Sequence, residues 1–229
     1  MNNLSSISKA AFEMTTLRDS SAPQSSASGF GLSLRCVSGE AIVPWLDQLA
    51  RLRIEVFREW PYLYDGDLAY ERDYLQAYVS SEASVMVLAL RDACAEGGEL
   101  IGASSGLPLI HADKAFQAPF EDQPDLLNDI FYFGESVLAA DYRGKGLGHA
   151  FFNEREEHAC RQGFERAVFC AVQRSVDHPR RPAHSRDLTS FWCGRGYLPI
   201  PNGVTSFSWL DIGESMTSRK PMQFWAKCL

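Results

Sequence analysis

The chain has 229 residues, of which 45% are hydrophobic and 12% aromatic, with 22 Lys and Arg against 29 Asp and Glu. This composition excludes intrinsic disorder for the body of the chain, and the length allows a core that needs no disulfide or metal to hold it. The net charge of −7 argues against a general nucleic-acid or anionic-membrane binder, which would need a basic surface, and it leaves room for a cationic partner.

The sequence also carries signals about location. It has no apolar run near the roughly 18–20 residues of a membrane helix, and its beginning lacks the apolar stretch of a secretory signal. The six cysteines form no CxxC pair, so we expect reduced thiols in a cytoplasmic protein. Residues 1–30 are rich in Ser and are expected to be a disordered tail. A mitochondrial transit peptide is the alternative, although Lys9 and Arg18 are its only cations.

From residue 31 the first half of the chain alternates between strand and helix patterns. The pattern predicts a strand at 32–37, helices at 41–60 and 68–81, and strands at 84–91 and 100–107. Pro44 is tolerable only in the first turn of its helix. Gly97 and Gly98 lie between the two later strands, and this predicts a β-hairpin.

The second half predicts the remaining elements. They are a strand at 130–139, a helix at 147–162, a strand at 166–172, a short helix at 187–194, and a closing pair of strands at 205–210 and 222–225. Residues 112–128 are irregular, and Gly163 is expected to end the long helix. The strand–helix–strand order over 130–172 predicts one parallel β-α-β unit. We therefore expect a single α/β domain over 31–229, built on a mixed sheet.

One loop in this unit is a candidate phosphate site. An apolar strand runs into a segment with alternating glycines, Gly144, Gly146 and Gly148, which then opens a helix. Glycine lets the backbone turn tightly and approach a ligand closely. The free N–H groups and positive dipole end of a helix start suit an anion. Arg143 and Lys145 add positive charge at the same place.

The spacing of these residues distinguishes the loop from two other phosphate-binding loops. The segment lacks the GxxxxGK of a Walker loop, and a GxGxxG dinucleotide fingerprint would need glycine where His149 stands. The arrangement Arg-x-x-Gly-x-Gly, formed by Arg143, Gly146 and Gly148, resembles the pyrophosphate-binding signature of the GNAT acetyltransferase superfamily. The aromatic-rich stretch 188–197, which ends in Gly-Tyr, looks like the second sequence block of that family.

The resemblance covers nearly the whole chain except residues 1–30, and it implies a GNAT-like acyl-CoA N-acyltransferase fold that uses acetyl-CoA (coenzyme A) as cofactor. In that family the pyrophosphate lies over the glycine loop, and the pantetheine arm runs between two splayed parallel strands, here 130–139 and 166–172. Carried over by position, the loop contacts, largely main-chain N–H groups, come from Arg143, Gly144, Lys145, Gly146, Leu147, Gly148 and His149. The strand contacts come from Ser136, Val137 and Leu138, whose backbones pair with the pantetheine. The Leu138 N–H is expected to donate to the thioester oxygen.

The implied chemistry is direct attack of an amine on a thioester. An amine is protonated at neutral pH, so it needs a base before it attacks. Glu135, just before the pantetheine residues, is the first candidate for this base, directly or through water. The alternative is that Glu135 caps a sheet edge or pairs with an arginine.

The second block departs from the family pattern at two positions. Trp192 stands where the family usually has a tyrosine that acts as the acid, and Arg186 stands where an asparagine often opens the helix. An indole cannot donate a proton as an acid, so the acid stays open. Either another residue serves, or the thiolate leaves with a solvent proton, and Tyr197 is a candidate core aromatic.

Two loops are candidates for contact with the substrates. The family usually builds its acceptor site between the first two helices, where Tyr62, Tyr64 and Asp65 suit a cationic amine through cation–π contact and charge pairing. A packed aromatic loop with solvated acids is the alternative. The locally basic loop 174–186 could contact the 3′-phosphate of CoA, gate the acceptor site, or be solvated. Its two histidines lack the spacing of metal ligands, so no metal site is expected.

The sequence thus predicts an acetyl-CoA-dependent N-acetyltransferase that favours a small cationic amine. Two alternatives stay open. One is acetylation of a lysine or N-terminus of another protein, and the other is a GNAT-like protein that binds acyl-CoA without catalysis. The expected partner is a small-molecule amine, with no nucleic acid and no membrane, and the closing strands leave a homodimer open.

Overall fold

The computed structural model describes residues 31–91 and 98–229, and the statements below concern these ranges. They form a seven-stranded sheet in the order β1-β2-β3-β4-β5-β7-β6. The strands are β1 Leu32–Val37, β2 Val85–Arg91, β3 Glu99–Pro108, β4 Ile130–Leu138, β5 Arg166–Val172, β6 Leu198–Trp209 and β7 Ser218–Cys228. Neighbouring strands are antiparallel except β4 and β5, which run parallel and are connected in the chain by helix α5 (Leu147–Arg161). The predicted mixed sheet and its β-α-β unit are confirmed.

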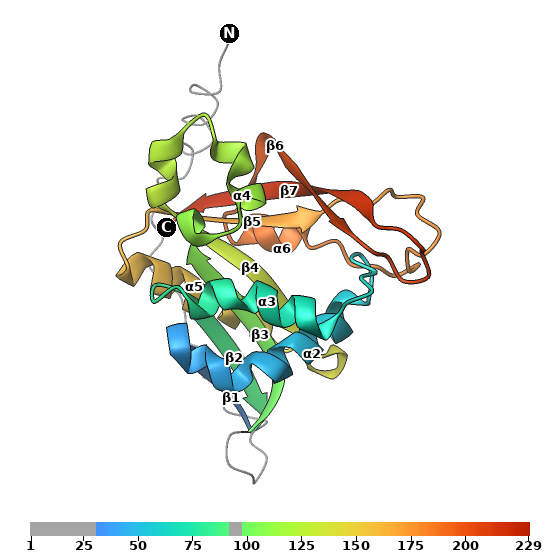
Figure 1. Cartoon of the computed structure of the whole chain (residues 1–229), viewed down its shortest axis with the longest axis horizontal. Helices are drawn as coiled ribbons and strands as arrows, with labels where there is room; N and C mark the ends of the chain where they lie inside the picture. Colours follow the sequence, from blue (N-terminus) through green and yellow to red (C-terminus); the bar gives the residue numbers. More distant parts are fainter. Residues whose placement is uncertain (1–30, 92–97) are drawn as a thin grey trace.

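Helices cover both faces of this sheet (Figure 1). The α-helices are α2 Leu46–Phe57, α3 Leu68–Val79, α4 Lys114–Gln117, α5 Leu147–Arg161 and α6 Thr189–Gly194. The 3₁₀ turns are η1 Gly39–Trp45, η2 Leu109–His111, η3 Ala118–Phe120, η4 Pro124–Asn128 and η5 Ala140–Tyr142. Helices α2 and α3 lie over one face, and α5 and α6 lie over the other (Figure 1). One apolar cluster fills the space under α2 and α3, and a second, rich in aromatic rings, lies under α5 and α6. None of the described helices is long and apolar enough to cross a membrane.

The structure corrects two of the predicted elements. The helix expected over 41–60 is a 3₁₀ turn followed by an α-helix that starts at Leu46, because Pro44 lacks an N–H and its ring obstructs the preceding turn. The last two strands are longer than predicted. Residues 199–204, which contain proline and glycine, lie outside the predicted strand at 205–210, but a register shift between Pro199 and Val204 accommodates them in β6.

The predicted hairpin between β2 and β3 has its antiparallel pairing. Gly97 in its turn lies outside the described residues, as do Cys94 and residues 1–30. The other predicted strands and helices are confirmed to within a few residues at their ends, and Gly163 follows α5 with a φ of +85°.

Candidate functional site

The parallel strands β4 and β5 separate soon after they begin. They pair only over Ile130–Tyr132 against Arg166–Val168, and further along β5 pairs with β7 on its other side. The N–H of Ala139 donates to the carbonyl of Ile101 on β3 at 2.9 Å. Because hydrogen-bonded and non-bonded positions alternate in an antiparallel pair, the backbone groups of Ser136 and Leu138 point away from β3, toward the gap beside β5.

This gap is the place that the resemblance assigns to the pantetheine arm. Ser136 and Leu138 present their backbones to it. Val137 does not fit its predicted role, because the same alternation turns its backbone toward Ala103 on β3 and its side chain is fully buried in the core.

The gap begins at a β-bulge in β4. Ser104 lies opposite Ser136 and Gly106 lies opposite Phe133, so two residues of β4, Gly134 and Glu135, face the single residue Ser105. A Cβ at Gly134 would lie 2.1 Å from the hydroxyl of Tyr78, so any larger residue would displace that side chain. The bulge turns the Glu135 side chain toward α2 and α3.

The glycine loop, residues 143–148, follows β4 and leads into α5. Gly144 and Gly146 have φ values of +75° and +86°, which other residues rarely adopt, and a Cβ at either position would extend into open space. Gly146 is the N-cap of α5, and no described side chain caps this helix start. Its first N–H groups are therefore available to an anion such as a pyrophosphate. The Leu147 side chain is buried in the core, so only its backbone faces the loop.

Two cations in the loop have partners on the protein. The guanidinium of Arg143 binds both carboxylate oxygens of Glu59, at 2.6 and 3.1 Å, and its Nε donates to the Leu138 carbonyl at 3.0 Å. Its side chain is thus directed to the end of α2, and the charge expected at the pyrophosphate is shared with a carboxylate. The Lys145 ammonium lies 5.1 Å from the centre of the Tyr142 ring.

His149 lies in the first turn of α5, and its side chain faces α6. Its ring nitrogen Nδ1 lies 3.2 Å from a guanidinium nitrogen of Arg195, and its ring meets Phe191 edge to face. The glycine loop and the start of α5 are therefore joined to the second sequence block by side-chain contacts.

Glu135 belongs to a buried charge cluster, formed by Arg53, Glu71 and Glu135. The guanidinium of Arg53 binds Glu135 at 2.5 Å and also pairs with Glu71, and all three side chains are at most 7% exposed. The pairing with an arginine that the sequence left open is thus present. Because two carboxylates share one guanidinium, the cluster carries a net charge of −1 when both are ionised. Its attraction for a cation is strong, since burial weakens the screening by water.

The hydroxyl of Tyr74 on α3 joins this cluster to a pocket. It donates to the second carboxylate oxygen of Glu135 at 3.2 Å, and it lies 3.2 Å from the hydroxyl of Tyr78. Burial, followed by the negative charge of Glu135, raises the pKa of Tyr74 well above its ordinary value. Tyr74 therefore stays protonated and acts as a hydrogen-bond donor to Glu135 at neutral pH.

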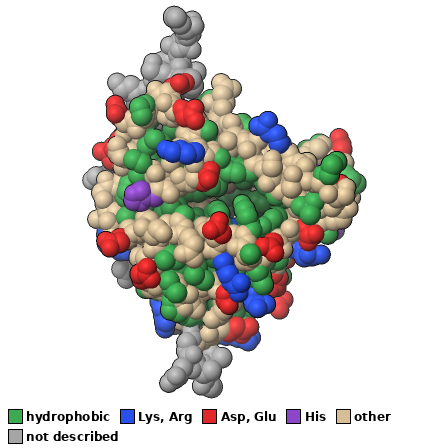
Figure 2. Space-filling model, in the orientation of Figure 1, with side chains coloured by type: hydrophobic (Ala, Val, Ile, Leu, Met, Phe, Trp, Pro, Cys, Tyr) green, Lys and Arg blue, Asp and Glu red, His purple; other side chains and the backbone are tan. Residues whose placement is uncertain are grey.

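We call the pocket beside Tyr74 the acceptor pocket. It has a volume of about 350 Å³ and is lined by Tyr70, Asp73, Tyr74, Ala77, Tyr78, Leu107, His111, Ala112, Asp113, Phe116 and Tyr132. The α3 residues among these recur every three or four positions and form one stripe of the helix. Figure 2 shows the hollow that crosses this face of the molecule, with hydrophobic side chains at its floor and acidic as well as basic ones around it. Neither Lys nor Arg is among the lining residues.

The predicted acceptor loop lies apart from this pocket. Tyr62 packs against Phe57 and Trp209, and Asp65 forms an exposed ion pair with Arg58 at 3.2 Å. Tyr64 lies beside Glu71, and its pKa is raised first by burial and then by that carboxylate. None of the three lines the acceptor pocket. The packed-loop alternative fits Tyr62 and Asp65 better than substrate contact does.

Arg174, the first residue of the basic loop, holds this segment in place. It donates to the carbonyls of Pro61 and Tyr62 at 2.8 and 2.6 Å, and it forms a bidentate pair with Asp211 at 2.8 and 3.0 Å. Lys220 binds the same carboxylate at 3.1 Å. At this end the basic loop is therefore a structural support for the acceptor side of the molecule.

The second sequence block supplies core residues. Trp192 packs between Phe169 and Trp225, and Tyr197 is fully buried with its hydroxyl donating to Glu156 at 3.0 Å. Tyr197 is thus a core aromatic. Tyr74, Tyr78 and Tyr132 escaped the sequence analysis, and the only signal for the first two was their four-residue spacing within a predicted helix.

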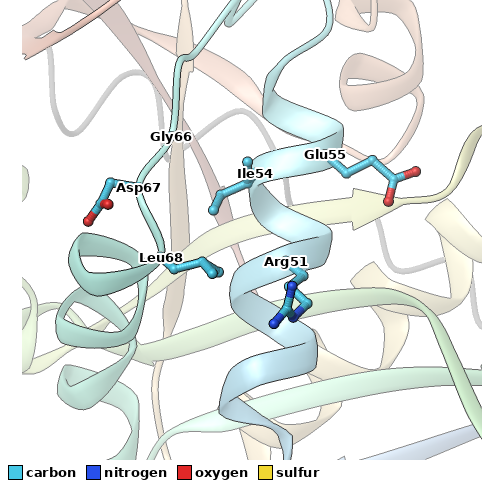
Figure 3. A pocket seen from close by; sticks show the side chains of 6 residues that line it. All are labelled: Arg51, Ile54, Glu55, Gly66, Asp67 and Leu68. Atoms are coloured by element: carbon cyan, nitrogen blue, oxygen red, sulfur yellow. The ribbon is translucent and has the colours of Figure 1, made fainter.

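A second hollow of about 470 Å³ opens between α2 and the start of α3 and is lined by Arg51, Ile54, Glu55, Gly66, Asp67 and Leu68 (Figure 3). The Asp67 carboxylate is already engaged there, because it accepts the N–H groups of Ala69 and Tyr70 as the N-cap of α3. This hollow does not include Glu135 or the glycine loop. We therefore place the candidate active site at the acceptor pocket and the gap beside β4.

Comparison with known proteins bears on this site. The sequence model of the acetyltransferase (GNAT) family matches residues 49–188, from α2 through the glycine loop, α5 and β5 to the residue before α6. No curated protein matches the sequence of the chain.

Among the solved structures with a similar fold are three acetyltransferases from bacteria. A GCN5-related N-acetyltransferase from Kribbella flavida is 16% identical with a TM-score of 0.52, over 87% of this chain and 98% of that one. An acetyltransferase from Streptococcus agalactiae is 15% identical with a TM-score of 0.54, over 87% and 99%. A ribosomal-protein-alanine N-acetyltransferase from Brucella melitensis is 16% identical with a TM-score of 0.53, over 86% and 99%. At these identities the likeness is one of fold.

Proposed function

We propose that this chain, which belongs to the acetyltransferase (GNAT) family, transfers the acetyl group of acetyl-CoA to a small cationic amine. Family membership supports the N-acetyltransferase activity and the acetyl donor. The identity of the acceptor rests on the acceptor pocket and the charges around it.

The residues present fit acetyl-CoA. The glycine loop offers backbone N–H groups at an uncapped helix start, and β4 turns the backbones of Ser136 and Leu138 toward the gap beside β5. Bound there, acetyl-CoA supplies an activated thioester. Gly146 binds through its main chain, so the conformation of the loop matters more than the side chains that it carries.

The acceptor pocket is the observation that carries the choice of a cationic amine. Its volume of about 350 Å³ lies near the lower end of the range for small-molecule sites. Tyrosine rings attract an ammonium group through cation–π contact, and Asp73 and Asp113 add negative charge at the walls. The buried cluster of Arg53, Glu71 and Glu135 behind Tyr74, with its net negative charge, also attracts a cation to the pocket.

The proton of the ammonium group can leave through Tyr74. Glu135 itself does not line the acceptor pocket, but the Tyr74 hydroxyl lies between the pocket and its carboxylate. We propose that Tyr74 passes its own proton to Glu135 as it accepts one from the amine, so that the phenolate never accumulates. This gives Glu135 the role of base that the sequence suggested, and it gives Tyr74 a role that the sequence did not show.

The experiment follows thiol release from acetyl-CoA over a panel of amines. The panel contains tyramine, phenethylamine, spermidine, agmatine and a lysine-containing peptide. We expect turnover of the small amines to exceed that of the peptide. Turnover of the peptide alone would favour protein acetylation, and acetyl-CoA binding without turnover of any amine would contradict the proposal.

Tyr74→Phe tests the relay, with Tyr70→Phe as the matched control. Both tyrosines line the acceptor pocket from α3, but only the Tyr74 hydroxyl binds Glu135. Loss of a general acid–base group typically lowers kcat by about 10²–10⁴-fold, and we expect Tyr74→Phe to fall near the lower end because a water can replace the hydroxyl. Tyr70→Phe should change kcat by less than about 3-fold. Equal effects of the two variants would exclude Tyr74 as the relay.

A further inference from the structure

Arg155 on α5 is among the most deeply buried side chains of the protein, at 1% exposure. It lies on the opposite face of the sheet from Arg53 and makes four hydrogen bonds. Its nitrogens donate to the carbonyls of Phe151, Ser105 and Glu135 at 3.1, 3.1 and 3.2 Å, and to the Ser136 hydroxyl at 2.9 Å. The guanidinium also lies 4.4 and 4.9 Å from the ring centres of Phe133 and Phe152.

The two strand carbonyls that Arg155 binds belong to the β-bulge. Where Gly134 and Glu135 face Ser105 alone, the regular ladder between β3 and β4 is interrupted, and buried carbonyls there need another partner. Arg155 supplies it for Ser105 and Glu135. The Glu135 N–H is also satisfied, because it donates to the Ser105 hydroxyl at 3.2 Å. Arg155 and Ser105 together therefore hold the bulge in one conformation.

The contact with the Glu135 carbonyl also affects the backbone N–H of Ser136, the next residue along β4. That carbonyl shares its peptide group with the N–H of Ser136, and the peptide is trans, so the two groups point in opposite directions. A cationic donor on the carbonyl polarises the peptide and strengthens the N–H as a donor. The Ser136 N–H points away from β3, into the gap beside β5.

The charge of Arg155 is available for this effect because its four acceptors are all uncharged oxygens. Burial lowers its pKa to about 10, with partial compensation from Tyr197 and Glu135, so it remains protonated at neutral pH. An aliphatic side chain would fill the same space without satisfying the carbonyls of the bulge. Packing alone therefore does not explain a guanidinium at this position.

We infer that Arg155 is a positioning residue for acetyl transfer, which acts through the Glu135–Ser136 peptide to aim and strengthen the Ser136 N–H as a hydrogen-bond donor to the thioester carbonyl. This inference rests on the proposed function, since it requires acetyl-CoA in the gap beside β4. It also assigns to Ser136 the donor role that the sequence expected of Leu138, because the Ser136 N–H shares its peptide group with the carbonyl that Arg155 binds.

The main measurement reads the thioester directly and needs no acceptor, and kcat is measured separately with an amine that the wild type acetylates. Acetyl-CoA labelled with ¹³C at the carbonyl is bound to the full-length protein, and its C=O stretch is read by isotope-edited infrared difference spectroscopy. Wild type, Arg155→Met and Arg155→Lys are compared, with Arg161→Met as the control. Arg161 is an exposed arginine on the same helix that pairs with Glu157. The affinity of CoA is measured for each variant by calorimetry.

In the wild type we expect the bound C=O stretch at lower wavenumber than in free acetyl-CoA, because a strong donor weakens the carbonyl bond. Arg155→Met should lose most of this displacement, Arg155→Lys part of it, and Arg161→Met none, while CoA affinity changes by less than about 3-fold in each. Removal of one oxyanion donor lowers kcat by about 10²–10³-fold, so a weakened donor should lower it by about 10- to 100-fold without raising KM for acetyl-CoA.

Two results would overturn the inference. One is an unchanged C=O displacement in Arg155→Met, and the other is a loss of CoA affinity that parallels the loss of the displacement, which is the signature of a purely structural role. If Arg155→Met does not fold, Arg155→Lys decides, since it keeps the charge but cannot reach all the acceptors. Failure of the wild type to bind acetyl-CoA would instead contradict the proposed function, so the two failures are distinguishable.

Discussion

The contact between Arg143 and Glu59 leads to a prediction that the sequence alone does not suggest. Arg143 begins the glycine loop, yet its guanidinium is bound to a carboxylate at the end of α2. If the pyrophosphate is to gain this charge, Arg143 must first give up Glu59. Glu59→Gln removes the competing carboxylate and leaves the loop sequence intact, so we expect it to tighten the binding of CoA.

The size of the effect follows from the geometry of the pair. The side chains of Arg143 and Glu59 are 42% and 48% exposed, so their attraction is screened by water. Exposed ion pairs contribute about 0.2–1 kcal/mol, and the bidentate geometry places this one toward the upper end. Release of about 0.5–1 kcal/mol corresponds to a CoA dissociation constant about 2- to 5-fold lower in Glu59→Gln.

Calorimetric titration with CoA at 50 mM and 500 mM NaCl measures this change. Glu55→Gln is the matched control, because it removes an exposed carboxylate from the last turn of α2, four residues before Glu59, which follows the helix. The gain in Glu59→Gln should shrink at high salt, where exposed charges are screened. Weaker CoA binding in Glu59→Gln would show that the pair instead holds Arg143 in its binding position, and would refute the competition.

Further predictions concern the glycine loop and the support of the acceptor side. Gly146→Ala should lower CoA affinity about 10-fold or more in a calorimetric titration. A φ of +86° costs a residue with a Cβ roughly 1–2 kcal/mol, and the new methyl group points into the open space where the phosphate is expected. Gly163→Ala, also at positive φ but outside the site, is the control in the same titration. Asp211→Asn should destabilise the fold by about 3–5 kcal/mol in denaturant melts, because Arg174 and Lys220 lose their shared buried carboxylate. Burial raises the pKa of Asp211, but hydrogen bonds from Arg174 and Lys220 outweigh it and hold the pKa below its ordinary value of about 4. The stability that Asp211 contributes is therefore complete above about pH 4 and is lost as the pH falls through its folded-state pKa, so thermal melts of wild type and Asp211→Asn should converge in acid. A constant difference at all pH values would contradict this.

Much of the fold could be predicted from the sequence because periodicity is a local property. The strand at 32–37 and the strand at 166–172 have the same bounds in the structure as in the prediction. The prediction was less accurate at two prolines. Pro199 disfavours a strand locally, yet it lies in β6 because β6 pairs with β7, and Pro44 lies in a 3₁₀ turn where an α-helix was predicted.

Only part of the candidate site could likewise be predicted from the sequence. The glycine loop could be found from the sequence since its residues are contiguous and its conformation depends on glycine itself. The environment of Glu135 could not be found, because Arg53 and Tyr74 come from helices far away in the chain and meet it only when α2 and α3 cover the sheet. The packing of the loop that contains Tyr62 could not be predicted for a related reason. Its aromatic residues resemble a binding surface in sequence, but Tyr62 is used for packing.

The charged residues best show what the sequence determines and what only the tertiary structure determines. The sequence by itself determined a net charge of −7, a glycine loop suited to an anion, and the family to which these belong. Only the tertiary structure decided where the charges act. It placed two carboxylates on one guanidinium behind Tyr74, engaged Arg143 with Glu59, and put a buried Arg155 under the bulge. The physical reason is that charge is a sum over the chain, whereas its effect depends on burial and distance, which exist only after folding.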